Sequence, residues 1–440
     1  MRRGVGVLTA GRHRTRSFAL ASERGPMRHV IIGNGPAGVI AAEALRAQRS
    51  TDEITLVGDE PEPPYSRMAI PYLLIGDIGE EGTHLRKGTD HFSRLRVTLR
   101  HAFAKSVDTQ ARTVTLNDGE ALPYDRLLLA SGSSPADPPI PGIHSPGVMT
   151  CWTLADARKI AGSVQRGARV LQLGAGFIGC IIMESIAARD ASLTVVEMGD
   201  RVLPRMMPAG AAALIKKWCE TKGVRILTGT KAVQIDRDAS GLHVRLENGE
   251  TLDVDVIISA TGVRPNIAFL SGSGIKTENG ILVDDHMQTS ATDVYAAGDC
   301  TESVEFATGK RIINAIQLNA ADQARIAALN MVGRTTCSQG AIALNVLDTF
   351  GLISASFGQW QGIAAGEQVE LSDETAFKYL RLAFEDDVLI GATSLGLTEH
   401  VGVIRGLIQS RAKLGRWKPH LMQDPTRVMA AYLAAAQDAA

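Results

Sequence analysis

Two glycine-rich segments restrict what this chain can fold into more than any other feature. They read Gly-Asn-Gly-Pro-Ala-Gly over 33–38 and Gly-Ala-Gly-Phe-Ile-Gly over 174–179. Both match the G-x-G-x-x-G pattern, in which glycines let the backbone approach the phosphates of a dinucleotide. A single copy also occurs as an ordinary packing turn between a strand and a helix. Two copies in one chain predict two dinucleotides held together, one passing electrons to the other.

Each segment has the context that the motif requires, between a strand pattern and a helix pattern. Residues 28–32 and 169–173 are short apolar runs typical of buried parallel strands, and helix patterns follow at 39–45 and 181–186. The first glycine makes the turn, the second admits the pyrophosphate, and the third lets the helix pack against the strand. The expected contacts are Gly33, Gly35, Pro36, Ala37 and Gly38 for the first dinucleotide, and Gly174, Gly176, Phe177, Ile178 and Gly179 for the second.

The second segment opens a repeat of the first part of the chain. Leu-Ala-Ser-Gly at 129–132 and Ser-Ala-Thr-Gly at 259–262 both end a buried-strand pattern, which indicates an internal repeat. The proline-rich stretch from Pro135 to Pro141 is a predicted linker between the first domain and the second. We expect an α/β fold with two Rossmann-like dinucleotide-binding domains and a smaller α+β C-terminal domain. The first dinucleotide-binding domain is expected to comprise residues 27–140 and 266–335. The second is expected to comprise 141–265, and the C-terminal domain 336–440.

Composition excludes several classes of protein. The net charge is −1 and aromatic residues make up 5% of the chain, so no basic surface for nucleic acid is expected. No apolar run approaches the roughly 20 residues of a membrane span. The five cysteines are scattered without a C-x-x-C pair, which argues against a disulfide framework, a zinc site and a protein-bound iron–sulfur cluster, and no metal site is expected. This cysteine usage favours a reducing cytoplasm.

The first 26 residues differ from the rest of the chain. They contain six arginines and a single acidic residue, Glu23. Their composition is similar to that of a transit peptide, but they lack a secretory apolar core. We expect a disordered extension over 1–26, or a start site that is really Met27.

The order of the motifs resembles the pyridine nucleotide–disulfide oxidoreductase superfamily of two-dinucleotide-binding flavoproteins. A third motif, Asp-Val-Tyr-Ala-Ala-Gly-Asp-Cys over 293–300, completes the match, which covers about residues 27–335. Within the superfamily the chain is most similar to the flavin part of NADH-dependent nitrite reductases and to rubredoxin and ferredoxin reductases. The resemblance implies that the first segment binds FAD and the second binds NAD(H). It also implies that Gly298 and Asp299 meet the ribityl chain of FAD, with the following helix, 315–331, pointing its N-terminus at the flavin.

Further FAD contacts follow from the same resemblance. The stretch 57–61, followed by Pro-Tyr-Ser-Arg at 64–67, is similar to the region after the second strand in ferredoxin reductases. By this match Asp59, or else Glu60, binds the FAD ribose, and Arg67 pairs with the pyrophosphate. Gly132, at the end of the repeated strand, is expected beside FAD.

The NAD site has its own set of expected residues. Glu197 closes the strand pattern over 193–197, at the spacing expected for a carboxylate that accepts the ribose hydroxyls of NAD. A carboxylate there repels the 2′-phosphate of NADPH, so NADH is favoured, although Arg201 and Arg205 lie nearby. Gly262 is expected beside NAD by the repeat.

Three positions depart from the family pattern. Where the disulfide-reducing and NADH-oxidase branches carry a redox cysteine, this chain has Met68, whose thioether cannot form a thiolate or a disulfide. The ferredoxin reductases have a lysine and a glutamate paired near the flavin, and Tyr72 and Ile181 stand at those positions here. We therefore expect a less polar flavin environment, with the flavin itself as the redox centre and no catalytic side chain assigned.

These observations predict an FAD-containing, NAD(H)-dependent electron-transfer oxidoreductase. Without a cysteine pair or cluster ligands, the chain needs an external partner, expected to be an iron–sulfur or rubredoxin-type protein or subunit. The chain is thus expected in an oligomer or complex, for example as the NAD-reducing subunit of a larger oxidoreductase. Two alternatives stay open. One is an NADH oxidase that uses oxygen, and the other is a non-enzymatic flavin-binding assembly subunit.

Overall fold

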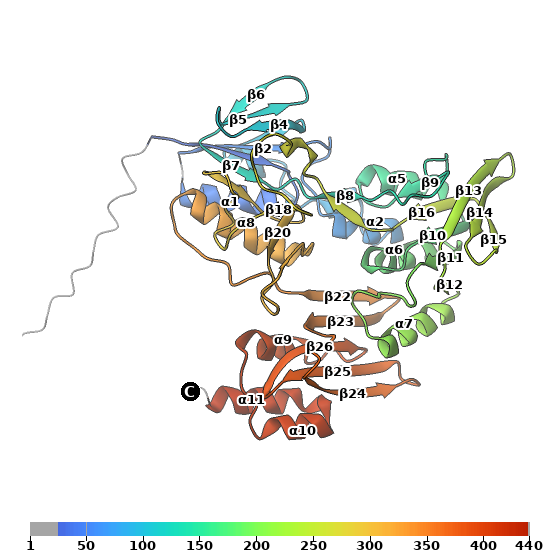
Figure 1. Cartoon of the computed structure of the whole chain (residues 1–440). Helices are drawn as coiled ribbons and strands as arrows, with labels where there is room; N and C mark the ends of the chain where they lie inside the picture. Colours follow the sequence, from blue (N-terminus) through green and yellow to red (C-terminus); the bar gives the residue numbers. More distant parts are fainter. Residues whose placement is uncertain (1–24, 50, 439–440) are drawn as a thin grey trace, which may run out of the picture.

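The structure is a computed structural model that describes residues 25–49 and 51–438. The expected extension over 1–26 lies almost wholly outside the described residues. The described chain forms two parallel-sheet units and an antiparallel C-terminal unit (Figure 1), which confirms the expected α/β class. Among the described residues, no helix combines the length and the apolar character that crossing a membrane would demand.

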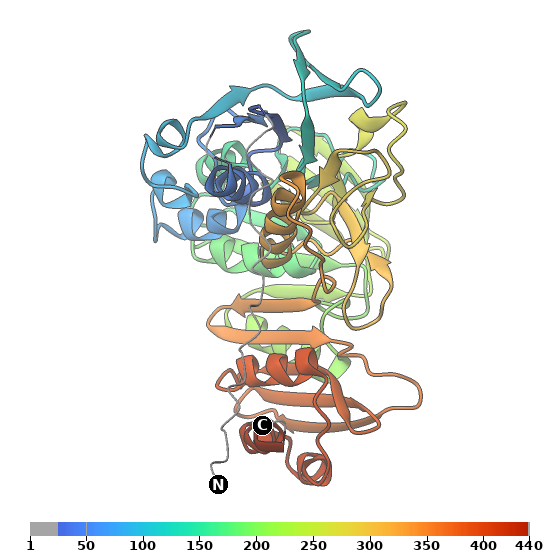
Figure 2. The same cartoon turned by 90° about the vertical axis from the view of Figure 1, so that its left-hand side faces the viewer.

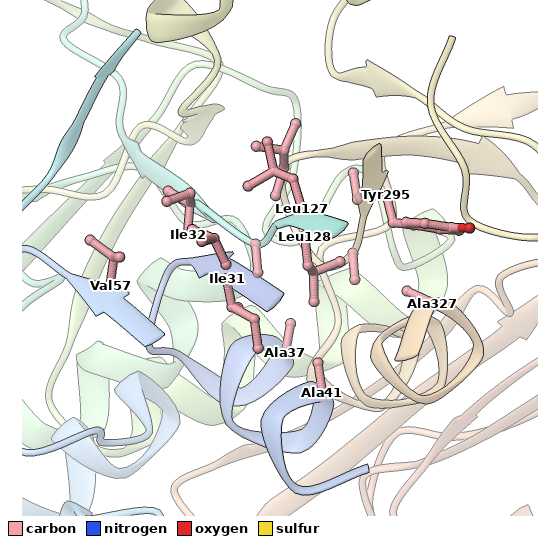
Figure 3. Close-up of a cluster of buried hydrophobic side chains, with 14 of the residues drawn as sticks. Ile31, Ile32, Ala37, Ala41, Val57, Leu127, Leu128, Tyr295 and Ala327 are labelled. Atoms are coloured by element: carbon pink, nitrogen blue, oxygen red, sulfur yellow. The ribbon is translucent and has the colours of Figure 1, made fainter. Parts of the chain in front are cut away.

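The first unit is built on a five-stranded parallel sheet in the order β19-β7-β1-β2-β3. Its strands are β1 Arg28–Ile32, β2 Glu53–Gly58, β3 Val97–His101, β7 Arg126–Leu129 and β19 Val294–Ala296. Two helices, α1 Pro36–Gln48 and α8 Gln317–Met331, pack against each other and against this sheet. Most of their inward positions are alanine, and such small side chains let the two helices approach closely. Figure 3 shows Ala37 and Ala41 of α1 and Ala327 of α8 beside Ile31, Leu127 and Leu128 of the sheet.

The second unit repeats this plan with a parallel sheet in the order β12-β11-β10-β16-β9. Its strands are β9 Val148–Thr150, β10 Arg169–Leu173, β11 Ser192–Glu197, β12 Arg225–Thr228 and β16 Val256–Ser259. Its helices are α5 Leu154–Ser163, α6 Phe177–Ala187 and α7 Ala209–Thr221.

Each parallel sheet carries a small antiparallel sheet between its later strands. These are β4 Ala104–Asp108, β5 Thr113–Leu116 and β6 Ala121–Pro123 in the first unit, and β13 Ala232–Asp238, β14 Gly241–Leu246 and β15 Thr251–Val254 in the second. The Asn-Asp-Gly and Glu-Asn-Gly-Glu turns join their hairpins. The internal repeat seen in the sequence is thus also a repeat of architecture.

The chain passes between the two units along a short two-stranded ladder. Strand β8, Ser133–Pro135, pairs antiparallel with β17, Val263–Pro265, so both crossings lie side by side. The irregular region after β2 contains η1 Arg67–Ala69, α2 Ile70–Ile75, α3 Glu80–Thr83 and α4 His91–Arg94. The return to the first unit contains η2 Ala268–Leu270, β18 Ile281–Leu282, β20 Thr301–Val304 and β21 Arg311–Ile312.

The C-terminal unit is a five-stranded antiparallel sheet in the order β22-β23-β26-β25-β24, followed by helices. The elements are β22 Leu344–Thr349, β23 Leu352–Gly358, β24 Glu367–Asp373, β25 Lys378–Glu385, β26 Val388–Leu395, α9 Val401–Ser410, α10 Trp417–Gln423, η3 Pro425–Arg427 and α11 Val428–Asp438. Side chains alternate along its strands: Tyr379 joins the core of the second unit, whereas Leu380 joins the core under the helices. Figures 1 and 2 show this unit below the other two, with β22 nearest to them.

Candidate cofactor sites

The first glycine turn has the geometry that a pyrophosphate cradle requires. Gly33 has φ +110°, and a Cβ there would overlap the carbonyl oxygen of Ala130 on the neighbouring strand end. A Cβ at Gly38 would overlap the carbonyl oxygen of Gly33. At Gly35, in contrast, a Cβ would meet no described atom within 4 Å. Gly33 and Gly38 thus shape the turn, and Gly35 borders the space where the pyrophosphate of a dinucleotide would lie.

The second glycine turn repeats this division of roles. Gly174 has φ +98°, and a Cβ there would lie 2.5 Å from the carbonyl oxygen of Ala260. A Cβ at Gly179 would overlap the carbonyl oxygen of Gly174, whereas Gly176 again faces open space among the described atoms. Phe177 and Ile178 form the first turn of α6. Both sites therefore fit the dinucleotide that the sequence predicts for them.

The helix that follows each turn keeps its N-terminus free for a ligand. Gly35 and Gly176 are the N-cap residues of α1 and α6, and no described side chain caps either helix. Pro36, at the start of α1, has no N–H to satisfy. The other orphan N–H groups of a first turn attract anions, since they lie at the positive end of the helix dipole. Helix α5 differs, because Thr153 and Asp156 close its first turn with a capping box.

Asp299 joins the first turn to a polar cluster between the units. Its Oδ2 accepts a hydrogen bond of 3.2 Å from Ser133 Oγ. Burial raises the pKa of Asp299, and the bond from Ser133 and the charge of Arg67 oppose that rise. Next to it, Gly298 has φ +85°, and a Cβ there would lie 3.3 Å from Cβ of Ala37 on α1. The carboxylate is thus placed beside the first glycine turn.

Arg67 lies in the same cluster but is held by protein groups. It donates to Glu60 Oε1 at 2.8 Å and to the carbonyl oxygen of Ser133 at 3.3 Å. Its guanidinium lies 5.0 Å from the ring centroid of Trp152, whose Nε1 donates to the same carbonyl oxygen at 3.0 Å. Sequence reasoning missed Ser133 and Trp152, and only the position of Ser133 directly after Gly132 hinted at a role.

The two candidate carboxylates after β2 have different environments. Glu60 is engaged by Arg67 and accepts a 2.5 Å hydrogen bond from the hydroxyl of Tyr65. That hydroxyl also accepts the N–H of Leu154 at 3.2 Å, and burial together with Glu60 raises the pKa of Tyr65. Asp59 is exposed, and its carbonyl oxygen lies 3.1 Å from Nε2 of His101.

Glu197 ends β11 and closes around the second glycine turn. Its Oε2 accepts the N–H of Ala175 and its Oε1 accepts the N–H of Gly199, both at 2.7 Å. A carboxylate has further lone pairs beyond these two bonds, so the predicted ribose contact stays open to it. Of the two nearby arginines, Arg201 pairs with Asp200 at 2.7 Å, and Arg205 is exposed.

The three positions that depart from the family pattern lie on η1, α2 and α6, and α2 packs against both η1 and α6. Met68 lies in η1 and is 47% exposed, and Tyr72 lies in α2 and is 54% exposed. Ile181 is partly buried on α6, and Ser185 Oγ donates to the carbonyl oxygen of Pro71 at 3.3 Å. Met68 and Tyr72 thus present thioether and phenol groups to the surface, not a thiol and an amine.

Gly132 and Gly262 sit at equivalent strand ends, after β7 and β16. Both have positive φ, and a Cβ at either would meet no described atom within 4 Å. Asn266, which the sequence did not single out, ties the two crossings together. Its Nδ2 donates to the carbonyl oxygen of Ser131 at 3.0 Å, and its N–H donates to that of Gly132 at 3.0 Å.

The N-terminal end of α8 offers further polar groups to a ligand. Gln317 begins the helix and accepts a 3.2 Å hydrogen bond from Ser66, just before Arg67. Just before the helix, Nδ2 of Asn314 is buried without a partner among the described residues. A buried amide in that state is costly unless a ligand or water satisfies it.

One cysteine contacts a glycine turn, because Sγ of Cys180 donates to the carbonyl oxygen of Ala175 at 3.5 Å. All five lie in the described part of the chain and are free. Cys180, Cys219 and Cys300 are fully buried, and burial raises the pKa of each thiol. Burial also raises the pKa of Cys151 to about 12. These four thiols therefore carry little thiolate at neutral pH.

Comparisons with known proteins agree with this geometry. Residues 27–323 match the profile of the pyridine nucleotide-disulphide oxidoreductase family. The epsilon subunit of the NADH-dependent phenylglyoxylate dehydrogenase of Aromatoleum evansii is 34% identical over 405 residues, which are 91% of this chain and 96% of that protein. An NADH oxidase of Methanocaldococcus jannaschii is 32% identical over 318 residues, 70% of each chain. The crystal structure of the covalent putidaredoxin reductase–putidaredoxin complex matches with a TM-score of 0.86 and 25% identity, over 94% of this chain and 100% of the matched one.

Proposed function

The chain belongs to the pyridine nucleotide-disulphide oxidoreductase family, and on this premise we propose that it is the NAD(H)-linked flavin subunit of an electron-transfer complex. It is an FAD-dependent oxidoreductase that uses NAD(H) and exchanges electrons with an iron–sulfur or rubredoxin-type partner. The partner that we propose is an iron–sulfur subunit that associates stably with this chain. The match to the epsilon subunit supports it, because a match over 91% of this chain extends into the C-terminal unit.

The chain's own residues supply orientation, and the cofactor supplies the redox chemistry. Bound FAD would supply two-electron exchange with NADH and one-electron exchange with a partner. We assign the first glycine turn and Asp299 to FAD, with Asp59 as the ribose carboxylate because Glu60 is engaged by Arg67 and Tyr65. We assign the second turn and Glu197 to NAD(H), with NADH favoured over NADPH.

One observation carries the need for a partner: no thiol lies on the segment from η1 to α2, where the family's redox cysteine would stand. Met68 occupies that place and cannot cycle between thiol and disulfide. Electrons that reach the flavin must therefore leave the chain. The free, mostly buried cysteines also support a reducing compartment, and we propose the cytoplasm.

A second candidate is an NADH oxidase that passes electrons to oxygen, which the Methanocaldococcus relative favours. The match to that oxidase covers 70% of this chain, and the match to the epsilon subunit covers 91%. We therefore prefer the electron-transfer subunit.

Steady-state turnover separates these functions. NADH oxidation by the FAD-loaded chain would be measured with oxygen alone, with a ferredoxin, with a rubredoxin and with an artificial one-electron acceptor. We expect the protein acceptors to raise turnover several-fold over oxygen. Fast oxygen reduction without a gain from either protein indicates the oxidase, and no turnover with any acceptor indicates a non-enzymatic subunit. Copurification from the native host then tests the partner, because recovery of the chain alone contradicts a stable complex.

A further inference from the structure

Three side chains with different metal-binding atoms meet at the surface of the first unit. Asp285, His286 and Cys337 place one carboxylate oxygen, one imidazole nitrogen and one thiol sulfur within 4.8 Å of one another. Asp285 and His286 follow β18, whereas Cys337 lies in the linker 332–343 between α8 and β22. The three lie near the C-terminal end of α8, and Gln317 at its other end contacts Ser66 beside Arg67. The cluster is therefore at the end of α8 away from Arg67, and the second glycine turn lies on the other parallel-sheet unit.

The imidazole is oriented as a metal-ligating histidine would be. Nδ1 of His286 lies 3.0 Å from the carbonyl oxygen of Thr336. A carbonyl oxygen only accepts hydrogen bonds, so Nδ1 carries a proton, and in the neutral imidazole Nε2 then presents its lone pair. Ligating histidines almost always donate their second N–H to a carbonyl or carboxylate in this way, which fixes the tautomer.

The backbones that carry the three side chains are already joined. Asn330, near the end of α8, donates from Nδ2 to the carbonyl oxygens of Thr336 at 2.7 Å and His286 at 3.0 Å. Its Oδ1 accepts the N–H of Thr336 at 3.0 Å. The N–H of Ser338 donates to the carbonyl oxygen of Asp285 at 2.7 Å. The frame of the site therefore exists before any ion binds, which lowers the ordering cost of binding.

The distances suit a small tetrahedral ion. Nε2 of His286 lies 3.9 Å from Sγ of Cys337 and 3.7 Å from Oδ1 of Asp285. Around Zn²⁺, bond lengths of about 2.0–2.3 Å place neighbouring ligand atoms about 3.4–3.6 Å apart. Sγ also lies 3.7 Å from Nδ1, so binding requires the exposed Cys337 side chain to rotate toward Nε2. A thiolate–imidazole–carboxylate set selects zinc over magnesium or calcium, which prefer oxygen ligands.

We propose that Asp285, His286 and Cys337 form a binding site for a borderline-soft divalent cation, with Zn²⁺ as the preferred ion. Solvent supplies the fourth ligand, because Asp285 and Cys337 are exposed. The bound ion joins the linker 332–343 to the first unit and so restrains the connection to the C-terminal unit. The bound ion takes no part in electron transfer, and its role is to restrain the linker between the first unit and the C-terminal unit.

Metal titration of the FAD-loaded full-length chain tests the site. After chelator treatment, Co²⁺ is added as a probe, and the visible absorption of four-coordinate cobalt is followed at wavelengths beyond the flavin bands. Zn²⁺ bound per chain is measured by elemental analysis after dialysis. We expect one ion per chain, with affinity lowered more than about tenfold in Cys337→Ser and in His286→Gln, since even changes outside the ligand set cost that much.

A matched control is His243→Gln, because His243 pairs with Asp238 and Asp253 at the surface but has no thiol in its cluster. This variant keeps the cobalt spectrum of the parent if the proposal holds. Zinc should also slow proteolysis within 332–343 in the parent but not in Cys337→Ser. The FAD content of each variant shows whether it has folded. Binding that is equal in the parent and the Cys337→Ser/His286→Gln double variant overturns the proposal, as does loss of binding in His243→Gln alone.

Discussion

At the scale of single residues, the first turn contains one glycine that has space for a side chain and another that does not. Gly35 borders open space, whereas Gly38 faces the carbonyl oxygen of Gly33. We predict that Gly35→Leu folds but binds no FAD, because its side chain occupies the approach of the pyrophosphate. Gly38→Ala is expected to lower thermal stability both with and without FAD, because its Cβ would overlap the carbonyl oxygen of Gly33. Circular dichroism and the flavin spectrum of each purified variant measure both effects, and normal flavin content in Gly35→Leu would contradict the assignment.

Asp299 is expected to oppose folding in the absence of FAD. Burial raises its pKa above the ordinary 3.8, so the folded state keeps the proton to a higher pH than the unfolded chain does. Stability therefore falls as pH rises from 3.8 through the raised pKa, and the cost persists at neutral pH. We predict that Asp299→Asn raises the melting temperature of the FAD-free protein at pH 7 and weakens FAD binding. A pH series of melting curves checks this, and identical pH dependence in parent and variant rules it out.

Glu197 is predicted to set the preference for NADH. Glu197→Ala removes a charged acceptor from the ribose, which should cost about 1.5–3 kcal/mol in NADH recognition and narrow the gap to NADPH. The kcat/KM values for both nucleotides measure this effect. Asp200→Ala is the control, because Asp200 is an exposed neighbouring carboxylate paired with Arg201. If both variants behave like the parent, the ribose site lies elsewhere.

At the scale of elements, the segment from η1 to α2 determines how many electrons the chain stores. It carries Met68 and Tyr72, whereas Cys180 and Cys219 are buried in α6 and α7. We predict that anaerobic titration takes up two electrons per FAD, and that alkylation leaves turnover with a protein acceptor intact. Cys337→Ser serves as the control, because Cys337 is the exposed cysteine. Uptake of four electrons would reveal a redox-active dithiol.

The same segment illustrates what the sequence could predict about an element. The family pattern placed Met68, Tyr72 and Ile181 near the flavin, which stays a prediction, and the elements that carry them are neighbours, since α2 packs against η1 and α6. Neither propensity nor motif indicated that Glu60 would be engaged by Tyr65 and Arg67. That choice depends on which loop packs beside α5, and such packing is not encoded in local periodicity.

At the scale of the whole molecule, the C-terminal sheet is anchored on the second unit. Tyr379 is fully buried between them, and a Cβ at Gly210 of α7 would lie 3.0 Å from its ring. Trp218 of α7 donates from Nε1 to the carbonyl oxygens of Thr349 and Phe350 at 3.2 and 3.3 Å. The C-terminal unit is therefore packed onto the second unit as well as tethered by the linker 332–343.

We predict that Tyr379→Ala lowers the free energy of unfolding by about 3–5 kcal/mol, because it leaves a cavity in this interface. Tyr379→Phe should cost about 1 kcal/mol, since it removes only the 2.6 Å hydrogen bond to Glu370. Urea denaturation followed by circular dichroism compares the two. Equal effects would show that ring packing contributes little to the anchoring.

The sequence by itself determined the two glycine turns, the strands around them, the repeated plan and the family. Those features are local, because a positive φ, a buried run and a helix start each depend on a few neighbouring residues. Only the tertiary structure decided the network of Ser133, Arg67 and Asp299, the docking of the C-terminal sheet, and the meeting of His286 with Cys337. Each of these joins residues far apart in the chain, and their proximity arises from the packing of whole elements, which no short motif specifies.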